Sequence, residues 1–496
     1  MKKKRDWAED THNVCANIVN TVYSIIENVV SNRMAWEITG STLDCDIFWM
    51  DTNVNVEFCS KMKPYQFVNH FPGTGCISRK VDLSKNFFTM QKLFPEQYNF
   101  HPKSFTVPAE RSTLKNYMES MPADQRTFII KPDLGSQGKG IYLIQDPSEA
   151  LECKKLAIAQ QLIDPYLIDG LKFDLRVYAL VSSINPLRIY VYKEGLARFC
   201  TEEYEKPTSK NMHQSYKFLT NYSLNKHNKK FEQFHDGKGH KRSISCVFKQ
   251  LLENGVDIDK LWEEIYRIIV LTVIIGQPII AHNYKSSIKA QDGKSRCFEI
   301  LGFDILIDSN LKPWVLEVNH SPSFSTESDF DYHVKMDLIS ESLKILDINH
   351  IMRSRIINID KQRTYQRING TRQTDIPQLF NPTVESRISA STGWKLVYPA
   401  ANAAEFDKIL NRIEDLPKYG IEETHAFKCR KKASQSQIDE MERKALEAKR
   451  EPKPFVTSFG QYSVLTPKSH RLFVAPKVRP QTDTRRQPAR LIRLKT

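Results

Sequence analysis

The sequence predicts an α+β fold, because segments typical of strands and of helices mix without a regular β–α alternation. Residues 243–281 have a mostly helical pattern, whereas residues 303–308 and 314–319 flank a turn-forming Ser-Asn-Leu-Lys-Pro segment, which predicts a β-hairpin. Short segments rich in β-branched and aromatic residues predict further strands at 127–132, 140–144, 157–163, 174–181 and 187–193.

Four further segments complete the expected order of elements. Apolar residues recur at helical spacing across residues 8–32, which predicts an entry helix, and residues 47–107 are typical of short strands and loops. The most apolar stretch, residues 268–281, predicts a buried helix that ends near Gly276 and is too short to span a bilayer. A helix is expected at residues 332–345.

The hairpin places three oxygen-bearing side chains together. Centred on its turn, it puts Asp304 opposite Glu317, and alternation puts Glu317 and Asn319 on one face. Like charges placed opposite each other cost stability, and a hard cation removes that cost. Two carboxylates and an amide oxygen suit Mg²⁺, which completes its shell with nucleotide phosphates. Spacing alone equally permits a hairpin with three unrelated polar residues.

A lysine at the end of a predicted strand, Lys131, precedes a loop with three glycines at residues 135–140. The backbone N–H groups of such a loop approach phosphate oxygens closely, and a lysine supplies a point charge. The loop is not a P-loop, because it lacks the Gly-Lys-Ser/Thr order, and it lacks the strand-to-helix context of a dinucleotide fingerprint. A glycine hairpin without a ligand explains the pattern equally well.

Charged side chains alternate with apolar ones along a neighbouring predicted strand. Lys172, Asp174 and Arg176 therefore point to one face. On an exposed sheet, cross-strand charge pairing alone would explain this pattern.

Composition narrows the class of protein. The chain has 496 residues, 40% hydrophobic and 26% charged, which is ordinary for a globular protein of roughly two to four domains. A charged N-terminus without an apolar run predicts no signal peptide, and we expect no membrane association. Nine cysteines without a C-x-x-C pair favour reduced thiols in an intracellular protein.

The net charge of +14 predicts an acidic partner, and the positions of the basic residues along the chain indicate which segments would bind it. Residues 424–450 are typical of a charged helix, and the last 46 residues have ten Lys or Arg against two acids, as in a disordered tail. No RNP pattern, zinc-finger spacing or aromatic–basic platform favours nucleic acid. A second basic cluster fits either a cationic segment that binds an acidic partner or a solvated basic helix. It consists of Arg353, Arg355, Lys361, Arg363, Arg367 and Arg372.

Ordered motifs between about residues 45 and 340 resemble the tubulin tyrosine ligase-like family of ATP-grasp amino-acid ligases. The motifs are KMKPYQ at 61–66, NHFPG at 69–73, IKP at 130–132, QGKG at 137–140, GLKFDLRVY at 170–178, YKEGLARF at 192–199, LTNYS at 219–223, FD at 303–304 and LEVNHSPS at 316–323. So many motifs in one order indicate membership rather than coincidence, and no expected ligand position is lost.

The resemblance implies an ATP-grasp-type core with the nucleotide between two sheets. We expect an N-terminal subdomain at residues 1–125, a central subdomain at 126–240 and a C-terminal subdomain with the Mg²⁺ site at 241–348. A basic microtubule-binding segment at 349–425 would follow, and then a charged helix and disordered tail at 426–496.

The resemblance also implies a role for each matching residue. Asp304, Glu317 and Asn319 would hold Mg²⁺. Arg176, Arg198 and Glu317 would be catalytic, the arginines neutralising the transferring phosphoryl group or holding carboxylates. The ATP-binding set would be Lys131, Gln137, Gly138, Gln160, Gln161, Leu162, Ile163, Lys172, Asp174, Thr220 and Asn221. The substrate-binding set would be Gln137, Arg198, Asn221 and His320, and the six basic residues at 353–372 would bind microtubules.

Family members use ATP and Mg²⁺ to phosphorylate a carboxylate, and the amine of a free amino acid then attacks the acyl phosphate. The basic segment after the core favours a glutamylase that adds free L-glutamate to acidic tubulin tails, and Gln137 and His320 favour chain elongation. A glycine ligase of the same family and an inactive microtubule-binding scaffold are the alternatives. We expect a monomer of the cytoplasm and cytoskeleton, at cilia, flagella or basal bodies, without a nucleic acid partner.

Overall fold

The computed structural model describes residues 14–133, 135, 138–233, 237–288, 293–370, 381–400 and 403–414. These ranges fall within one unit, residues 1–420, and the second unit, residues 421–496, lies outside them. The charged helix expected at 424–450, and the region of charged helix and disordered tail expected at 426–496, therefore stay predictions.

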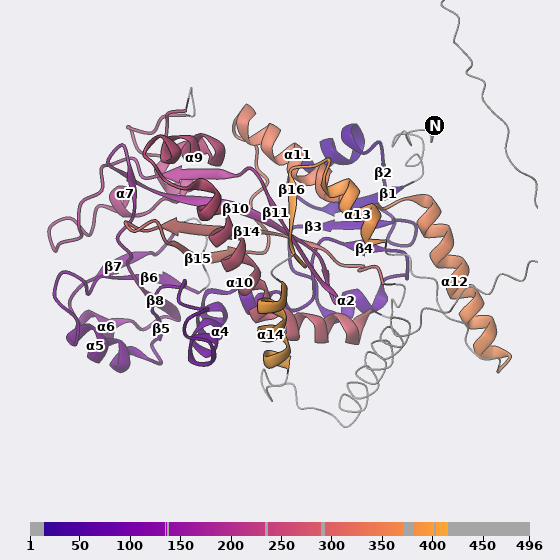
Figure 1. Ribbon diagram of the computed structural model, residues 1–496, viewed down its shortest axis with the longest axis horizontal. Helices are drawn as coiled ribbons and strands as arrows, with labels where there is room; N and C mark the ends of the chain where they lie inside the picture. Colours follow the sequence, from indigo (N-terminus) through magenta and orange to yellow (C-terminus); the bar gives the residue numbers. More distant parts are fainter. Residues whose placement is uncertain are drawn as a thin grey trace, which may run out of the picture. The chain divides into compact units, whose positions relative to one another are not determined.

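The N-terminal part builds a parallel sheet in the order β2–β1–β3–β4 (Figure 1). Its elements are β1 (Cys15–Asn20), α1 (Ser24–Asn28), the π-helix η1 (Val29–Arg33), β2 (Glu37–Ile38), β3 (Ile47–Met50), α2 (Val56–Lys61) and β4 (Phe67–Val68). The single entry helix predicted at residues 8–32 is wrong, because β1 occupies its middle. β1 pairs with β2 and β3 on its two sides, and this tertiary pairing overrides the helical spacing of its apolar residues.

A second, antiparallel sheet has the order β5–β8–β6–β7. It comprises β5 (Ser104–Val107), β6 (Phe128–Pro132), β7 (Tyr142–Ile144) and β8 (Ala157–Gln161). The helices α4 (Lys80–Leu93), α5 (Arg111–Glu119) and α6 (Glu149–Glu152) pack beside this sheet, and α3 (Gly75–Ser78) packs on α4. Three of the predicted strands are thereby confirmed. Because β5 pairs with β8, the expected subdomain boundary at residue 125 falls inside this sheet.

The central sheet has eight strands, ordered β13–β12–β10–β11–β16, with β9 and β14 also paired to β10 and with β15 paired to β14. Its strands are β9 (Leu167–Ile168), β10 (Leu171–Ile184), β11 (Leu187–Tyr192), β12 (Leu196–Phe199), β13 (Lys241–Ser243), β14 (Glu299–Ile307), β15 (Pro313–Asn319) and β16 (Trp394–Tyr398). The predicted hairpin is confirmed together with its register, in which Asp304 pairs with Glu317 and Gly302 with Asn319.

Helices bury both faces of the central sheet. Leu175 and Val177 of β10 share one apolar cluster with α10, whereas Tyr178 and Leu180, pointing the other way, share a second cluster with α11. The remaining helices are α7 (Ser215–Phe218), α8 (Tyr222–Asn225), α9 (Ile244–Glu253), α10 (Ile258–Ser287), α11 (Asp329–Leu346), α12 (His350–Ile368), α13 (Pro382–Ser389) and α14 (Ala403–Glu414). The helix predicted at 332–345 corresponds to α11.

Helix α10 is longer than expected, because it continues past Gly276 and Pro278 to Ser287. Gly276 is needed for close packing on α3, since a Cβ there would lie 2.7 Å from Cγ2 of Ile77. By length and composition α10 could cross a membrane, but 72% of its most apolar window is buried inside the protein. Its apolar surface therefore forms part of the core.

Candidate active site

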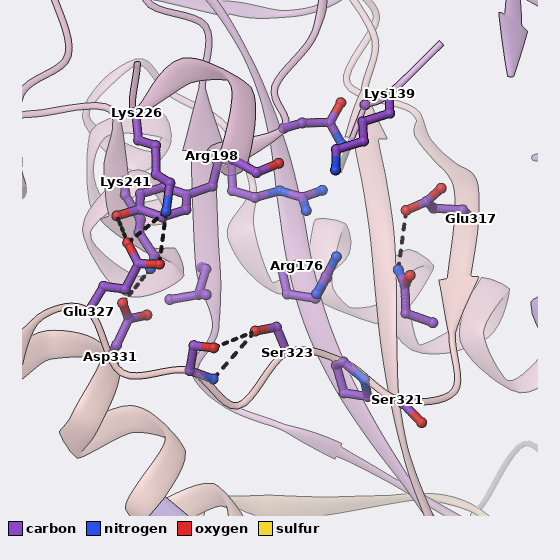
Figure 2. A pocket seen from close by; sticks show the side chains of 18 of the residues that line it. Lys139, Arg176, Arg198, Lys226, Lys241, Glu317, Ser321, Ser323, Glu327 and Asp331 are labelled. Atoms are coloured by element: carbon purple, nitrogen blue, oxygen red, sulfur yellow. Dashed lines mark hydrogen bonds and ion pairs between the residues drawn. The ribbon is translucent and has the colours of Figure 1, made fainter. Parts of the chain in front are cut away.

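A cavity of about 570 Å³ lies beside the central sheet, the glycine loop after β6 and the segment that follows β15 (Figure 2). The predicted site residues that line it are Lys131, Gly138, Arg176, Arg198, Asn221, Glu317 and Asn319. These residues come from β6, β10, β12, β15 and adjacent loops, so the fold gathers positions that are far apart in sequence.

Two arginines of the cavity wall are held by buried aspartates. Arg198 donates to both carboxylate oxygens of Asp174 at 2.7 Å, and its Nη2 lies 2.8 Å from Asp304. Arg176 donates to Asp304 from Nε at 2.5 Å and from Nη2 at 3.1 Å. The Thr220 hydroxyl donates to Asp174 at 2.6 Å. Bidentate pairs of this kind fix the guanidinium planes, so the two positive charges are held in place before a ligand arrives.

In the cross-strand pair Asp304 and Glu317, the pKa values of the two carboxyls are shifted in opposite directions. Burial alone would raise the pKa of Asp304, but the guanidiniums of Arg176 and Arg198 hold it well below its usual range. Burial, and then the negative charge of Asp304, raises the pKa of Glu317, although Lys80 lies 3.9 Å away. A divalent cation between the two carboxylates would relieve this repulsion.

Asn319 completes the oxygen donors at this position. Its Nδ2 donates to Glu317 at 3.3 Å and to the Gly302 carbonyl at 3.4 Å, so a turn of the amide would present its oxygen to a cation instead. Among the residues that the structure describes, no three His, Cys, Asp or Glu side chains form a metal-binding group. Two carboxylates with an amide oxygen nevertheless fit Mg²⁺, which takes few protein ligands and completes its shell with phosphate and water.

Lys131 lies in the cavity wall with its ammonium toward Gln160, to which it donates at 2.7 Å. Burial lowers its pKa to about 8, against the opposing charge of Glu317. Gly138 has φ +77° and packs on Asn221, whose Oδ1 would lie 3.1 Å from an added Cβ. A glycine is thus required there both by the left-handed backbone and by this close approach.

The structure does not bring every predicted ATP-binding residue to this cavity. Gln160 is buried behind Lys131, and Lys172 donates to the Phe218 carbonyl at 2.7 Å while burial lowers its pKa. Asp174 and Thr220 act on the cavity through Arg198. Gln161, Leu162 and Ile163 are half-buried and are not among the described residues that line it. Gln137 lies outside the described residues.

His320 lies beside the cavity rather than in its described wall. Its ring is 6.0 Å from that of His70, edge to face, and burial lowers its pKa. His70 in turn contacts Glu299 at 3.0 Å.

Five of the six basic residues predicted to bind microtubules lie on α12, where their environments differ. Arg353 is 3.4 Å from Asp46 and packs over the Tyr65 ring, so it is tied to the N-terminal sheet. Arg363 is half-buried, and Arg372 lies outside the described residues. The exposed members of the set are Arg355, Lys361 and Arg367.

Sequence reasoning missed several charged and polar groups in the cavity wall. Lys80, the first residue of α4, donates to the Gly135 carbonyl at 3.0 Å. Tyr178 continues the alternation of Lys172, Asp174 and Arg176, which was the signal that could have found it. Lys139 and Tyr222 stand within the QGKG and LTNYS motifs, although no role was predicted for them. The others carry no local signal: Lys226, Lys241, Glu327, Asp331 and Lys335.

Paired carboxylates facing fixed arginines and a lysine beside a glycine loop define a site for group transfer between anions, as in phosphoryl-transfer enzymes. A sequence profile described as the tubulin-tyrosine ligase family matches residues 58–355. The match covers more than half of the chain, which therefore belongs to this family, and the resemblance of the motifs is confirmed.

Individual relatives agree with this assignment. The chain is 41% identical over 358 residues to a Tetrahymena thermophila protein named "Probable beta-tubulin polyglutamylase", covering 71% of this chain and 30% of the relative. It is 37% identical over 426 residues to the human "Tubulin polyglutamylase TTLL6", covering 84% and 46%. It is 35% identical over 434 residues to the Danio rerio "Tubulin polyglutamylase ttll6", covering 86% and 55%. The chain thus spans about half the length, or less, of these curated relatives.

Proposed function

We propose that this chain is an ATP- and Mg²⁺-dependent protein polyglutamylase, which joins free L-glutamate to glutamate side chains in the C-terminal tails of tubulin. The observation that carries the proposal is the cavity in which the Asp304–Glu317 pair adjoins the fixed arginines Arg176 and Arg198. Membership of the tubulin-tyrosine ligase family and relatives named as polyglutamylases support it.

The metal and nucleotide would occupy the end of the cavity near β15 and the glycine loop. ATP supplies a phosphoryl group that activates the acceptor carboxylate, and the amine of free glutamate then displaces phosphate to form the amide. Asp304, Glu317 and Asn319 would hold Mg²⁺, while Lys131 and the backbone at Gly138 would face phosphate oxygens.

The arginines provide electrostatic stabilisation. Asp174 and Asp304 hold the guanidiniums of Arg198 and Arg176, so positive charge is present where oxyanions develop and needs no rearrangement during reaction. Such chemistry depends on charge and alignment rather than on a covalent nucleophile. Asn221, next to Gly138 and in the cavity wall, would help to orient the substrate.

The acceptor would be captured through charge. Tubulin tails are rich in glutamate, and the exposed Arg355, Lys361 and Arg367 of α12 would attract them, which makes capture sensitive to salt. A protein that acts in this way belongs to the cytoplasm and the microtubule cytoskeleton, including cilia and basal bodies. His320, beside the cavity, supports a preference for elongating chains, together with Gln137.

The test is a ligation assay with taxol-stabilised microtubules, ATP, Mg²⁺ and labelled glutamate or glycine. We expect the wild-type chain to incorporate glutamate, and Glu317→Gln to incorporate none while it still sediments with microtubules. Glu57→Gln is the matched control, because it removes an exposed carboxylate from α2 that pairs only with the exposed Lys61 among the described residues.

Three outcomes would contradict the proposal. Undiminished ligation by Glu317→Gln would refute the metal assignment. Incorporation of glycine in place of glutamate would select a glycine ligase. Microtubule binding without ATP consumption, with either donor, would favour an inactive scaffold.

A further inference from the structure

A second cavity, of about 720 Å³, lies between α12 and the core. Its wall comes from the end of α2, the loop before β4, the last turns of α10, the segment before β14 and one face of α12. None of the described residues that line it also lines the active-site cavity. A cavity of this volume can hold a small molecule, and the ligase chemistry proposed above leaves it without a role.

The wall of this second cavity is strongly basic. Asp360 is the one acidic residue among the described residues that line it, against six basic side chains, so the described wall has a formal charge of +5. A cleft lined by one sign of charge concentrates its field and attracts ions of the opposite sign. The basic residues are Lys63, Lys285, Lys294, Arg296, Arg363 and Arg367.

The fold holds part of this charge in place. Arg296 is 1% exposed and donates to the backbone carbonyls of Pro64 and Lys294. Its guanidinium also lies 5.4 Å from the centre of the Phe67 ring. The ammonium of Lys294 donates to the carbonyl of Asp347 at 3.1 Å. These contacts fix two cations in the wall before a ligand arrives, which lowers the entropy lost on binding.

Three other cations of the wall are accessible to a ligand. Lys285, in the last turn of α10, and Arg367, in the last turn of α12, are exposed, and Lys63 is half-buried. None of the three forms an ion pair within the described part of the chain. Their N–H groups can therefore donate to an anion without first leaving a carboxylate.

The chemistry of the wall favours phosphate groups. A phosphate ester carries up to two negative charges and three acceptor oxygens, so a few phosphates balance a charge of +5, whereas a glutamate peptide adds one charge and one backbone unit per residue. A nucleic acid base would need an aromatic face for stacking. Tyr284 is the one aromatic residue of the described wall, but it is 6% exposed, and its hydroxyl accepts from the backbone N–H of Arg296 at 2.9 Å.

We propose that this cavity binds a free small molecule with several phosphate groups, which bridges α12 and the core. The lysines and Arg296 donate to its phosphates from the core side, and Arg363 and Arg367 donate to them from α12. Apolar side chains of the same wall, Ile288 and Ile359, contact its carbon skeleton. Binding at this site requires neither catalysis nor an occupied active site.

The test is a calorimetric titration of inositol hexakisphosphate into the full chain, with and without Mg²⁺ and a non-hydrolysable ATP analogue. We expect one molecule to bind per chain in both conditions, with an affinity that falls as salt is raised. The double variant Lys285→Gln/Arg367→Gln should bind it roughly tenfold more weakly, because two charge-assisted donors are lost. Both side chains are exposed, and unchanged affinity for the ATP analogue would report an intact fold.

The matched control is the double variant Lys249→Gln/Arg355→Gln. It makes the same change of charge by removing one exposed lysine from α9 and one exposed arginine from α12, neither of which lines this cavity. We expect it to bind inositol hexakisphosphate like the wild type. Equal weakening in the two double variants would mean that net charge alone attracts the probe, and would overturn the proposal.

Other results would also overturn it. The wild type could show no saturable binding, or the ATP analogue could displace the probe, which would place the probe in the active site. Displacement by a hexaglutamate peptide at a similar concentration would assign the cavity to an acidic peptide. Binding to vesicles that contain phosphatidylinositol 4,5-bisphosphate, without binding of the free probe, would assign it to a lipid surface.

The site adjoins the basic surface of α12. Arg363 and Arg367 belong both to the wall and to the set predicted to bind microtubules, so an anion in the cavity lowers the charge that α12 offers. Given the proposed function, inositol hexakisphosphate should reduce sedimentation with microtubules, and should reduce it less for Lys285→Gln than for Lys249→Gln. Calorimetric binding with unchanged sedimentation would support the site and refute this competition. Binding of the probe by a chain that incorporates no glutamate would refute the proposed function alone.

Discussion

Replacing Glu317 by Gln should stabilise the metal-free protein. Glu317 and Asp304 are directly paired across β14 and β15, where the Cβ atoms of opposed residues lie about 5 Å apart. At an effective dielectric constant of about 20, two like charges at that separation repel by about 3 kcal/mol. Lys80, 3.9 Å from Glu317, offsets part of this repulsion. We therefore expect a net gain of about 1–2 kcal/mol in the free energy of unfolding.

The assay is urea denaturation in EDTA, followed by tryptophan fluorescence at several pH values. The pKa of Glu317 is raised in the folded chain, so its ionised form opposes folding and the cost appears as pH rises. The advantage of Glu317→Gln should be complete near neutral to mildly alkaline pH. It should disappear towards about pH 4, where Glu317 is protonated in both the folded and the unfolded state.

The same variant should lose the response to metal and nucleotide. At about 100 times the Kd, Mg²⁺ with a non-hydrolysable ATP analogue should stabilise the wild type by about 2.7 kcal/mol, and Glu317→Gln by much less. If Glu317→Gln were less stable than the wild type in EDTA, or were stabilised equally by Mg²⁺ and nucleotide, a repulsive carboxylate pair could not be the metal site.

Three further predictions concern a buried hydrogen bond, the packing of α10 and the binding of the nucleotide. Thr220→Val removes a 2.6 Å hydrogen bond to the buried Asp174 and should destabilise the fold by about 1.5–3 kcal/mol in urea titrations. A smaller loss would mean that the ion pair with Arg198 alone is enough to stabilise the buried Asp174 carboxylate. Gly276→Ala should cost about 1–3 kcal/mol by crowding Ile77, more than its gain in helix propensity of about 1 kcal/mol, and a net increase in the urea midpoint would contradict this. Burial lowers the pKa of Lys131 to about 8, so binding of a fluorescent nucleotide should weaken as pH rises from about 7 to 9. Lys131→Gln should bind the nucleotide weakly at every pH. If this variant showed the same pH profile as the wild type, a group other than Lys131 would cause the pH dependence.

The metal pair could be predicted from sequence because its geometry is local. Asp304 and Glu317 flank one short turn, and alternation along two strands determines which side chains share a face. Tyr178 was within reach of the same argument, two residues beyond Arg176. Lys80 and Asp331 were not, because one begins α4 and the other lies in the first turn of α11, and only the packing of these helices brings them to the cavity.

The errors in the fold have a similar cause. The apolar spacing at residues 8–32 is compatible with a helix, but β1 gains backbone partners on two sides from β2 and β3. Helix α10 was expected to end at Gly276 because glycine and proline usually end helices. Its continuation to Ser287 reflects burial against the rest of the core, with Gly276 selected for the contact with Ile77. Local patterns therefore predict hairpins better than elements whose partners lie far away in the chain.

The most direct test of the central claim is a mass spectrum of tubulin tails after incubation of microtubules with this chain, ATP, Mg²⁺ and glutamate. We expect mass increments of glutamate on tail peptides, longer chains on tubulin that already carries a glutamate branch, and no increments with Glu317→Gln. Unmodified tails with the wild-type chain, with glycine also inert, would contradict it.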